Sequence, residues 1–414
     1  IVIKGLQRLE YRGYDSSGVA IHKDNSVNVY KQKGKVQDLI DFAKNKDTKG
    51  NLAIGHTRWA THGLPNNINA HPHQSSNGEI SLVHNGIIEN YSVLKKELEQ
   101  RGHVFKSETD TEVLVHLIGD IHNNGKQSLF DSVRLALNEV IGAYAIVVIS
   151  DDNSDELIAA RKSSPLVVGL GEGEFFCASD ATPIIEYTKN VVYLEDGEIA
   201  HISLKNGLKL KTIGNQNKTP YIQELEMHLE TLEKGGYEHF MLKEIYEQPQ
   251  SIMDSMRGRF SVTKGKVALG GILDFEEKLI NAKRLIFVAC GTSWHAGLVG
   301  EYLFEEIARI PVEVEYASEF RYRNPIINED DVVIAISQSG ETADTLAAIK
   351  LAKERKATLI GICNVVGSSI SRETHCGSYT HAGPEIGVAS TKAFTAQVTI
   401  LTLMSMMIGK RKGT

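Results

Sequence analysis

The stretch Val332–Ile336 (VVIAI) is followed by Ser337–Thr342 (SQSGET) and then by Ala343–Leu351 (ADTLAAIKL). The apolar run predicts a buried strand, and apolar residues of the last segment recur at spacings of three and four, which predicts a helix. The loop between them would present hydroxyls and backbone N–H groups at a helix N-terminus, a favourable place for an anion. The loop has no Lys or Arg and no GxxxxGK(S/T) motif, which favours a sugar monophosphate over a nucleoside triphosphate.

The residues around this stretch alternate between strands and helices. The apolar run Leu285–Ala289 leads into Cys290–Ser293 and then a helix that extends to Glu306, and further strands are predicted at Pro311–Val314 and Thr358–Cys363. This alternation predicts an α/β doubly wound parallel sheet, in which ligands bind at the carboxyl ends of the strands. Both hydroxyl-bearing loops follow such strand ends.

The N-terminal half has a different pattern, with short strands suited to antiparallel pairing and turn residues between them. These predicted strands are Ser81–His84, Tyr144–Ile149, Leu157–Ala160, Pro165–Gly169 and Glu174–Ala178, with helices at Ser92–Arg101 and Asp110–Ile121. We therefore predict α+β layers. The polar segment Lys211–Thr219 is expected to be a loop and Ile222–Lys234 an acidic helix, so the domain boundary is placed near residues 211–240.

Composition limits the classes of protein that the chain can belong to. Its 414 residues are 42% hydrophobic and 23% charged, which is typical of a globular protein with two or three domains. The net charge of −7 disfavours nucleic-acid binding. The four cysteines are scattered and form no CxxC, so we expect a reducing compartment, no disulfide and no metal site. We expect no cofactor.

The sequence also bears on the membrane and on location. The one long apolar segment, Ala393–Ile408, includes Gln397 and Ser405 and is shorter than the ~20 residues that a membrane span needs. We predict a buried core helix there and no membrane association. No signal peptide is recognised at the start of the printed sequence, so the cytoplasm is the expected location.

Polar clusters in the N-terminal half suggest an amino-acid site. They are Tyr11–Ser16, His56–Gly63, Asn69–His73, His84–Gly86 and Glu108–Glu112. An α-carboxylate is held well by an Arg and an α-ammonium by a carboxylate, and Arg58 and Asp110 supply these groups. Amide hydrolysis needs donors aimed at the developing oxyanion. The Asn85 side chain and the Gly86 N–H could supply them.

Simpler interpretations exist for each of these residues. Arg58 could form an ordinary surface ion pair, and Asp110 could cap its helix. Asn85-Gly86 could be a type I′ hairpin turn. Four histidines could be metal ligands, but their spacing matches no common zinc site. We therefore interpret them as hydrogen-bonding side chains: His56, His62, His71 and His73.

Taken together, the motifs resemble the glutamine–fructose-6-phosphate aminotransferase (isomerising) family, also called glucosamine-6-phosphate synthase. The resemblance extends over nearly the whole chain in one order. It is carried by Gly5–Ser16, His56–Gly63, Asn69–His73, His84–Asn90, Glu108–Glu112, Lys243–Pro249, Ala289–Ser293, Ser318–Arg323, Ser337–Thr345 and Glu385–Lys392. It implies an N-terminal-nucleophile glutaminase domain with αββα layers, followed by a sugar isomerase (SIS) domain that binds fructose 6-phosphate.

The resemblance also implies roles for single residues. In the glutaminase site, Arg58 would hold the carboxylate of L-glutamine, Asp110 its ammonium, and Asn85 and Gly86 the oxyanion. The remaining glutamine-site residues would be Trp59, Thr61 and His62 in a closing loop, Arg12 and Gly13 near the nucleophile, and His71 near the domain junction. The sugar-phosphate site would comprise Cys290, Gly291, Thr292, Ser293, Ser337, Gln338, Ser339, Thr342, Val388 and Ser390. A plain helix cap would explain one hydroxyl of Ser337–Thr342 well and the others poorly.

The chain also departs from the family pattern. The family's nucleophile is an N-terminal cysteine, but the printed sequence opens at Ile1. The residues that carry out the isomerase reaction in the family lie beyond position 414. We therefore expect a fragment that binds ligands without hydrolysing glutamine. Its expected parts are a glutaminase domain at 1–215, a linker at 216–240 and a first isomerase subdomain at 241–414.

The whole enzyme would make glucosamine 6-phosphate and glutamate, the first step of amino-sugar synthesis, with ammonia passed between its domains, and the family suggests a homodimer. One alternative is a non-catalytic sugar-phosphate-binding relative. A second, an amidophosphoribosyltransferase, is disfavoured because Ser337–Thr342 stands where that family needs a phosphoribosyl-pyrophosphate loop.

Overall fold

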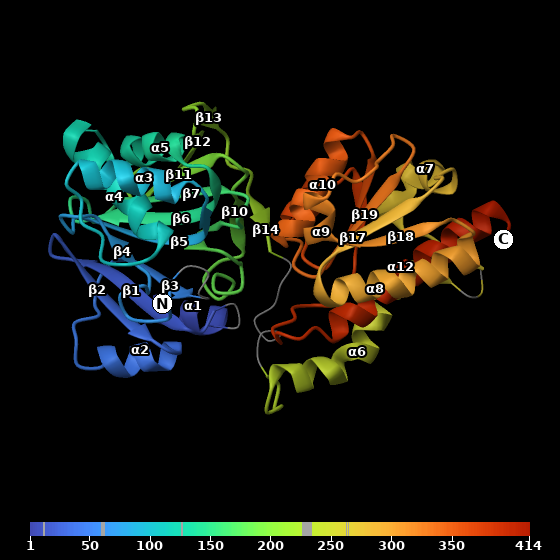
Figure 1. Ribbon diagram of the computed structural model, residues 1–414. Coiled ribbons are helices and arrows are strands. Elements are labelled where there is room, and N and C mark those ends of the chain that lie inside the picture. Colours follow the sequence, from blue (N-terminus) through green and yellow to red (C-terminus); the bar gives the residue numbers. More distant parts are fainter. Residues whose placement is uncertain (11–12, 59–62, 126, 226–233, 262, 264) are drawn as a thin grey trace. The chain divides into compact units, whose positions relative to one another are not determined.

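The computed structural model describes residues 1–10, 13–58, 63–125, 127–225, 234–261, 263 and 265–414. The chain folds into two compact units, Ile1–Leu229 and Glu230–Thr414. Each unit has its own sheets (Figure 1). Each also has its own hydrophobic core.

The first unit is built on a seven-stranded antiparallel sheet whose strand order is β13-β12-β11-β7-β6-β5-β4. Its strands are β4 (His73–Gln74), β5 (Ile80–Ile88), β6 (Gly142–Ser150), β7 (Leu157–Lys162), β11 (Glu198–Ser203), β12 (Gly207–Thr212) and β13 (Asn217–Lys218). Helices α3 (Tyr91–Gln100), α4 (Asp110–Gly125) and α5 (Leu129–Glu139) cover one face of it (Figure 1).

The other face of this sheet packs against two smaller sheets. One has the order β2-β1-β3, from β1 (Ser16–Lys23), β2 (Ser26–Lys33) and β3 (Leu52–Arg58). The other has the order β14-β10-β8-β9, from β8 (Val167–Leu170), β9 (Phe175–Ala178), β10 (Asn190–Tyr193) and β14 (Gln223–Glu224). Helices α1 (Val2–Leu9) and α2 (Val36–Ala43) lie outside the first of them. The predicted αββα layers are confirmed.

Strand β6 shows why the layers form. Tyr144, Ile146 and Val148 point into the core beneath the helices, whereas Ala145 and Val147 point into the core between the sheets. Side chains alternate between the two faces of a strand, and both faces of this one are covered. A continuous apolar run is therefore required here, because no position of the strand's middle faces water.

Two predictions near the end of this unit are wrong. The segment 211–219 is not a loop, because it contains the end of β12 and the short strand β13, which pair with each other. The acidic helix expected from Ile222 begins instead with β14, which pairs with β10; residues 226–233 lie outside the described residues. These edge strands are polar because their side chains are largely exposed, so composition gave no sign of them.

The second unit contains a five-stranded parallel sheet with the order β18-β17-β19-β20-β21. Its strands are β17 (Leu285–Ala289), β18 (Val312–Tyr316), β19 (Val332–Ser337), β20 (Thr358–Cys363) and β21 (Cys376–Tyr379). Helices α8 (Gly291–Leu303) and α12 (Lys392–Lys412) cover one face; α9 (Ala317–Tyr322), α10 (Ala343–Glu354) and α11 (Ser369–Glu373) cover the other. The predicted doubly wound sheet is confirmed.

The remaining elements flank this sheet: α6 (Phe240–Met256), the strand pair β15 (Phe260–Ser261) and β16 (Lys266–Val267), a 3₁₀ helix (Gly270–Phe275), α7 (Glu276–Ile280) and a π-helical turn (Phe304–Ala308).

Helix α12 is long and apolar enough to cross a membrane by length and composition alone. Ile400, Leu401, Met404 and Ile408 from this helix are buried in the core of the unit. The prediction of a core helix is therefore confirmed.

Candidate functional site

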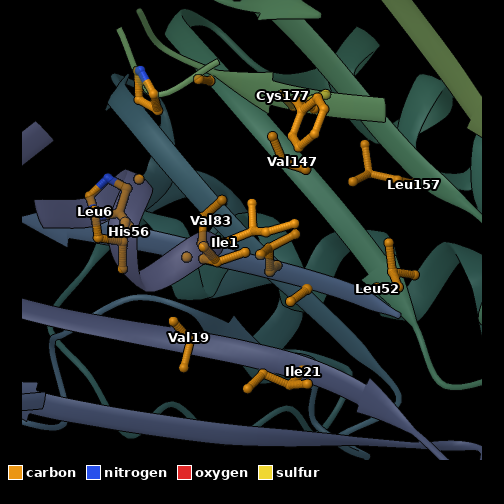
Figure 2. A pocket seen from close by; sticks show the side chains of 18 of the residues that line it. Ile1, Leu6, Val19, Ile21, Leu52, His56, Val83, Val147, Leu157 and Cys177 are labelled. Atoms are coloured by element: carbon orange, nitrogen blue, oxygen red, sulfur yellow. The ribbon is translucent and has the colours of Figure 1, made fainter. Parts of the chain in front are cut away.

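The first unit contains a cavity of about 1190 Å3 between its sheets, and this cavity is partly open to solvent. Most of its wall is apolar (Figure 2), formed by Val19 and Ile21 of β1, Leu52 of β3, Val83, Val147 and Leu157 of the large sheet, Cys177 of β9, and Ile1 and Leu6 near the start of the chain. One part of the wall is polar and contains His56, Arg58, Asn85, Gly86 and Asp110. The structure thus brings together the predicted carboxylate, ammonium and oxyanion groups around one cavity.

Arg58 is the last residue of β3 and is only 5% exposed. Its Nη2 donates a hydrogen bond to the Gly63 carbonyl over 3.3 Å. Burial lowers the pKa of the guanidinium, whereas the nearby carboxylates of Asp15, Asp110 and Glu108 raise it. Because an arginine stays charged even when its pKa falls somewhat, Arg58 offers a fixed positive charge to an anion in the cavity.

Asp110 begins α4, but it does not cap that helix. Its Oδ2 accepts the backbone N–H of Ile88, at the end of β5, over 2.8 Å. The cap is Thr109, whose Oγ1 accepts the N–H of Glu112 at 3.3 Å, and the Glu112 carboxylate accepts the N–H of Ser107 at 2.6 Å. The capping interpretation of Asp110 is wrong. The T-x-x-E pattern at 109–112 was the sequence signal that could have identified the cap.

Asn85 and Gly86 lie within β5, and the hairpin-turn alternative for them is wrong. They pair in register with Ala145 and Tyr144 of β6, so the strand continues through both. Gly86 has a φ of 143°, and a Cβ there would lie 2.1 Å from the Ala143 carbonyl oxygen. Only glycine fits. The Asn85 side chain is exposed and lines the cavity.

A closed ring of hydrogen bonds connects the strand that carries Asn85 to the helix that carries Asp110. The Nδ1 atom of His84 lies 3.0 Å from Thr111 Oγ1, which lies 3.4 Å from His71 Nε2. The backbone N–H of His84 donates to His71 Nδ1 over 3.3 Å. The Nε2 atom of His84 lies 3.5 Å from the Ala143 carbonyl.

These contacts fix the tautomers. His71 Nδ1 accepts a backbone N–H, so the proton of a neutral His71 is on Nε2 and is donated to Thr111. Within the ring, Thr111 donates its own proton to the nearer acceptor, His84 Nδ1 at 3.0 Å, whereas Asp110 Oδ1 lies 3.5 Å away. His84 in turn carries its proton on Nε2, which faces a carbonyl. Each group of the ring then donates once, and the ring requires a neutral His71 because its Nδ1 must accept.

Burial keeps these histidines neutral. It lowers the pKa of His56 to about 3 and the pKa values of His71 and His73 well below the ordinary 6.5. The rings of His56 and His71 stack at 4.4 Å, so protonation of one would also oppose protonation of the other. Within the described residues, no group of three or more His, Cys, Asp or Glu side chains is arranged to hold a metal ion.

Other glutamine-site predictions cannot be placed. Arg12, Trp59, Thr61 and His62 lie outside the described residues. Gly13 is buried, and its N–H donates to the Glu10 carbonyl at 3.1 Å.

The second candidate site lies where the strand order of the parallel sheet reverses. The chain passes from β17 to β18 on one side and then to β19 on the other, so the loops after β17 and β19 begin at neighbouring strand ends. In open α/β sheets this reversal point forms a crevice for ligands. The predicted loop at 290–293 is almost absent, because Cys290 follows β17 directly and α8 begins at Gly291. The segment after β19 extends from Gln338 to Thr342.

The Ser337–Thr342 loop is shaped by its own hydroxyls. Ser337 Oγ accepts the N–H of Gly340 and lies 3.0 Å from Thr342 Oγ1. Ser339 Oγ accepts the N–H of Glu341 at 3.1 Å. Thr342 precedes α10 and makes no side-chain cap bond to it, so the plain helix-cap interpretation is wrong. Gln338 is half-buried beside these residues.

Cys290 and the first turn of α8 contribute less uniformly. Gly291 and Thr292 are exposed, whereas Ser293 is buried and its Oγ accepts a hydrogen bond from Gln397 of α12 at 3.0 Å. Burial raises the pKa of the Cys290 thiol, and Thr345 donates to its sulfur. Cys290 is therefore a neutral thiol that lines the loop. Val388 is exposed and Ser390 is half-buried, on a separate loop before α12.

Comparisons with known proteins agree with this arrangement. A glutamine amidotransferase domain family matches residues 40–212, and a SIS domain family matches 278–407. The chain is 63% identical over its whole length to glutamine–fructose-6-phosphate aminotransferase (isomerizing) from Bacteroides thetaiotaomicron, of which it spans 68%. The corresponding enzyme from Thermococcus kodakarensis is 48% identical, and the chain spans 67% of it.

Among solved structures, the chain resembles the C-terminal domain of glucosamine-fructose-6-phosphate aminotransferase from Francisella tularensis. The identity is 42% and the TM-score 0.41, over 44% of this chain and 50% of that one. Fold, sites and family matches define a glutamine amidotransferase domain joined to a SIS domain. The chain belongs to the glutamine–fructose-6-phosphate aminotransferase (isomerizing) family.

The hydrogen-bond ring predicts a specific need for the Thr111 hydroxyl. A Thr111→Val substitution keeps the side chain's shape but leaves one imidazole donor and one imidazole acceptor buried without partners. We expect the free energy of unfolding of the first unit to fall by about 1–3 kcal/mol, measured by guanidinium denaturation. Thr111→Ser keeps the hydroxyl, so its free energy of unfolding should fall by less than that of Thr111→Val. Equal stability of the two variants would contradict the ring.

The buried histidines predict acid sensitivity. Their pKa values are lower in the folded state than the ordinary 6.5, so the unfolded chain binds more protons at any pH between these values. The contribution of these histidines to stability is present above about pH 6.5 and is lost as the pH falls toward 3.

Denaturation of the first unit at about pH 7 and about pH 5 measures this effect. His56→Gln should reduce the difference in unfolding free energy between the two pH values. The exposed His239 provides the control, because His239→Gln should leave the difference unchanged. An unaltered difference in His56→Gln would exclude His56 as a contributor.

Proposed function

We propose that this chain carries the glutamine site and the fructose 6-phosphate site of an enzyme that makes glucosamine 6-phosphate and glutamate. Family membership over the whole chain supports this proposal. The observation that carries it is the position of Arg58, Asp110 and Asn85-Gly86 around one cavity.

In the glutamine site, Arg58 would bind the α-carboxylate through its planar fork, and Asp110 would bind the α-ammonium. Two bonds hold Asp110 near β5: its carboxylate accepts the Ile88 N–H, and its neighbour Thr111 bonds to His84. The Asn85 amide would stabilise the oxyanion together with the Gly86 N–H. The distance between recognition and reacting groups would thus be set by α4 and β5.

The resemblance implies a cysteine thiolate as the nucleophile. The cysteines within this chain are unsuited to that role. Cys177 is the only one in the first unit, and burial raises the pKa of its thiol to about 12. Cys290, Cys363 and Cys376 belong to the second unit.

In the sugar site, the hydroxyls and N–H groups of Ser337–Thr342 would bind the phosphate, with help from the start of α10. Thr292 and Gln338 would bind sugar hydroxyls. The lack of cations in the loop suits a ligand that must bind reversibly and leave as a product of similar charge.

The domain limits, assembly and location of the enzyme belong to the same proposal. Residues 1–215 would form the glutaminase domain, 216–240 a linker and 241–414 the first isomerase subdomain. A homodimer in the cytoplasm is the expected assembly and location. No specific observation favours the alternative of a non-catalytic sugar-phosphate sensor, which would have no use for Arg58 and Asp110.

Glutamine binding tests the first site. We expect the wild-type chain to bind L-glutamine in titration calorimetry, and Arg58→Ala to weaken binding about 100-fold through loss of a charge-assisted pair. Arg101→Ala is the matched control, because Arg101 forms a half-exposed ion pair with Asp120 elsewhere on the unit. An absence of binding by the wild-type chain, or equal binding by Arg58→Ala, would refute the site.

Fructose 6-phosphate binding tests the second site. Thr342→Val removes one proposed phosphate donor, so we expect the dissociation constant to rise about tenfold. Thr263→Val, at an exposed position in the same unit, should have no effect. Fructose without phosphate should bind much more weakly than fructose 6-phosphate, and equal affinities would exclude the loop as a phosphate site.

A further inference from the structure

A buried glutamate on α6 accepts hydrogen bonds from the backbone of a loop that has no regular structure. Glu244 is 2% exposed. Its Oε1 accepts the backbone N–H groups of Ile386 at 2.6 Å and Gly387 at 3.0 Å, and its Oε2 lies 3.2 Å from the latter nitrogen. One carboxylate thus satisfies two consecutive N–H groups that have no strand or helix partner.

Gly387 is shaped for this contact. A Cβ on that residue would lie 2.5 Å from Glu244 Oε2, far closer than real contacts allow. The glycine therefore lets the carboxylate reach the backbone from the side. Any larger residue at 387 would have to displace the Glu244 carboxylate. A surface loop without this contact would not need glycine at that position.

A second carboxylate holds the other end of the same loop. Glu385 Oε1 accepts the N–H groups of Thr391 at 2.8 Å and Ala393 at 3.1 Å, at the start of α12. Its other oxygen accepts the hydroxyl of Ser390. The loop 385–391 is therefore fixed at both ends, and between these points Val388 remains 75% exposed.

Helix α6 is itself tied to α12. Lys392, buried at the start of α12, donates to Glu247 of α6 at 2.7 Å. Glu247 also pairs with Lys243, one helical turn earlier. Burial raises the pKa of Glu244, while the two backbone donors and Lys392 lower it. The side chains facing Glu244 thus include one further acid, Glu385, and one base, Lys392.

We propose that Glu244 is a positioning residue of the sugar-phosphate site: it holds the loop 385–391 so that Val388 and Ser390 present a fixed surface to the sugar. This inference rests on the proposed function, because it assumes that the loop lines a fructose 6-phosphate site. Glu244 acts through the loop backbone. A charged acceptor suits this task, because charge-assisted bonds to N–H groups are about twice as strong as neutral ones.

The experiment combines amide exchange with ligand binding in the 414-residue chain. In Glu244→Gln we expect faster hydrogen exchange at the Ile386 and Gly387 amides and about tenfold weaker binding of fructose 6-phosphate. Glutamine binding should be unchanged. Gly387→Ala, which pushes the carboxylate away while keeping its charge, should have the same two effects. Glu277→Gln, at an exposed glutamate of α7, is the control and should have neither effect.

The outcomes separate the two hypotheses. A wild-type chain that binds no fructose 6-phosphate would refute the sugar site and, with it, the role of Glu244 there. If the wild-type chain binds and both variants bind equally well, only the positioning role is overturned. If hydrogen exchange becomes faster over the whole second unit, and not only at the Ile386 and Gly387 amides, Glu244 has a general stabilising role. That result would also overturn the proposal.

Discussion

The structure depends repeatedly on side-chain carboxylates that accept backbone N–H groups near the two sites. Asp110 holds the end of β5, Glu112 holds Ser107 before α4, and Glu244 and Glu385 hold the loop before α12. Ile88 is the last residue of β5 and Ala393 lies in the first turn of α12, whereas Ser107, Ile386 and Gly387 lie in irregular segments. All of these donors therefore lie at or beyond the ends of regular structure. An unpaired buried N–H is costly, so each irregular segment needs a fixed acceptor.

This constraint explains how irregular segments can be rigid enough to bind small molecules. In the first unit, Asp110 would face the ammonium of glutamine with one part of its carboxylate while another part anchors β5. Recognition and oxyanion groups therefore belong to one connected structure. The ring of Thr111, His71 and His84 adds a second connection, and burial, which lowers the pKa values of both imidazoles, favours it.

The two units solve the positioning problem in different ways. The second unit relies on topology: parallel strands bring the loops after β17 and β19 to the same edge, as the alternating sequence predicted. The first unit relies on pairing between distant segments, and its site residues come from β3, β5 and α4. That is why the proposed sugar-phosphate loop could be predicted from a single stretch, whereas the proposed glutamine site needed scattered clusters and a family resemblance.

The sequence by itself determined the layers, the parallel sheet and the two hydroxyl-bearing segments at strand ends, because apolar periodicity and strand–helix alternation are local properties. It could not decide between a turn and a strand at Asn85-Gly86, since that depends on pairing with β6. Nor could it connect Glu244 to Gly387, which lies 143 residues further along the chain. Such choices belong to the tertiary structure, because only the folded chain determines which donor meets which acceptor.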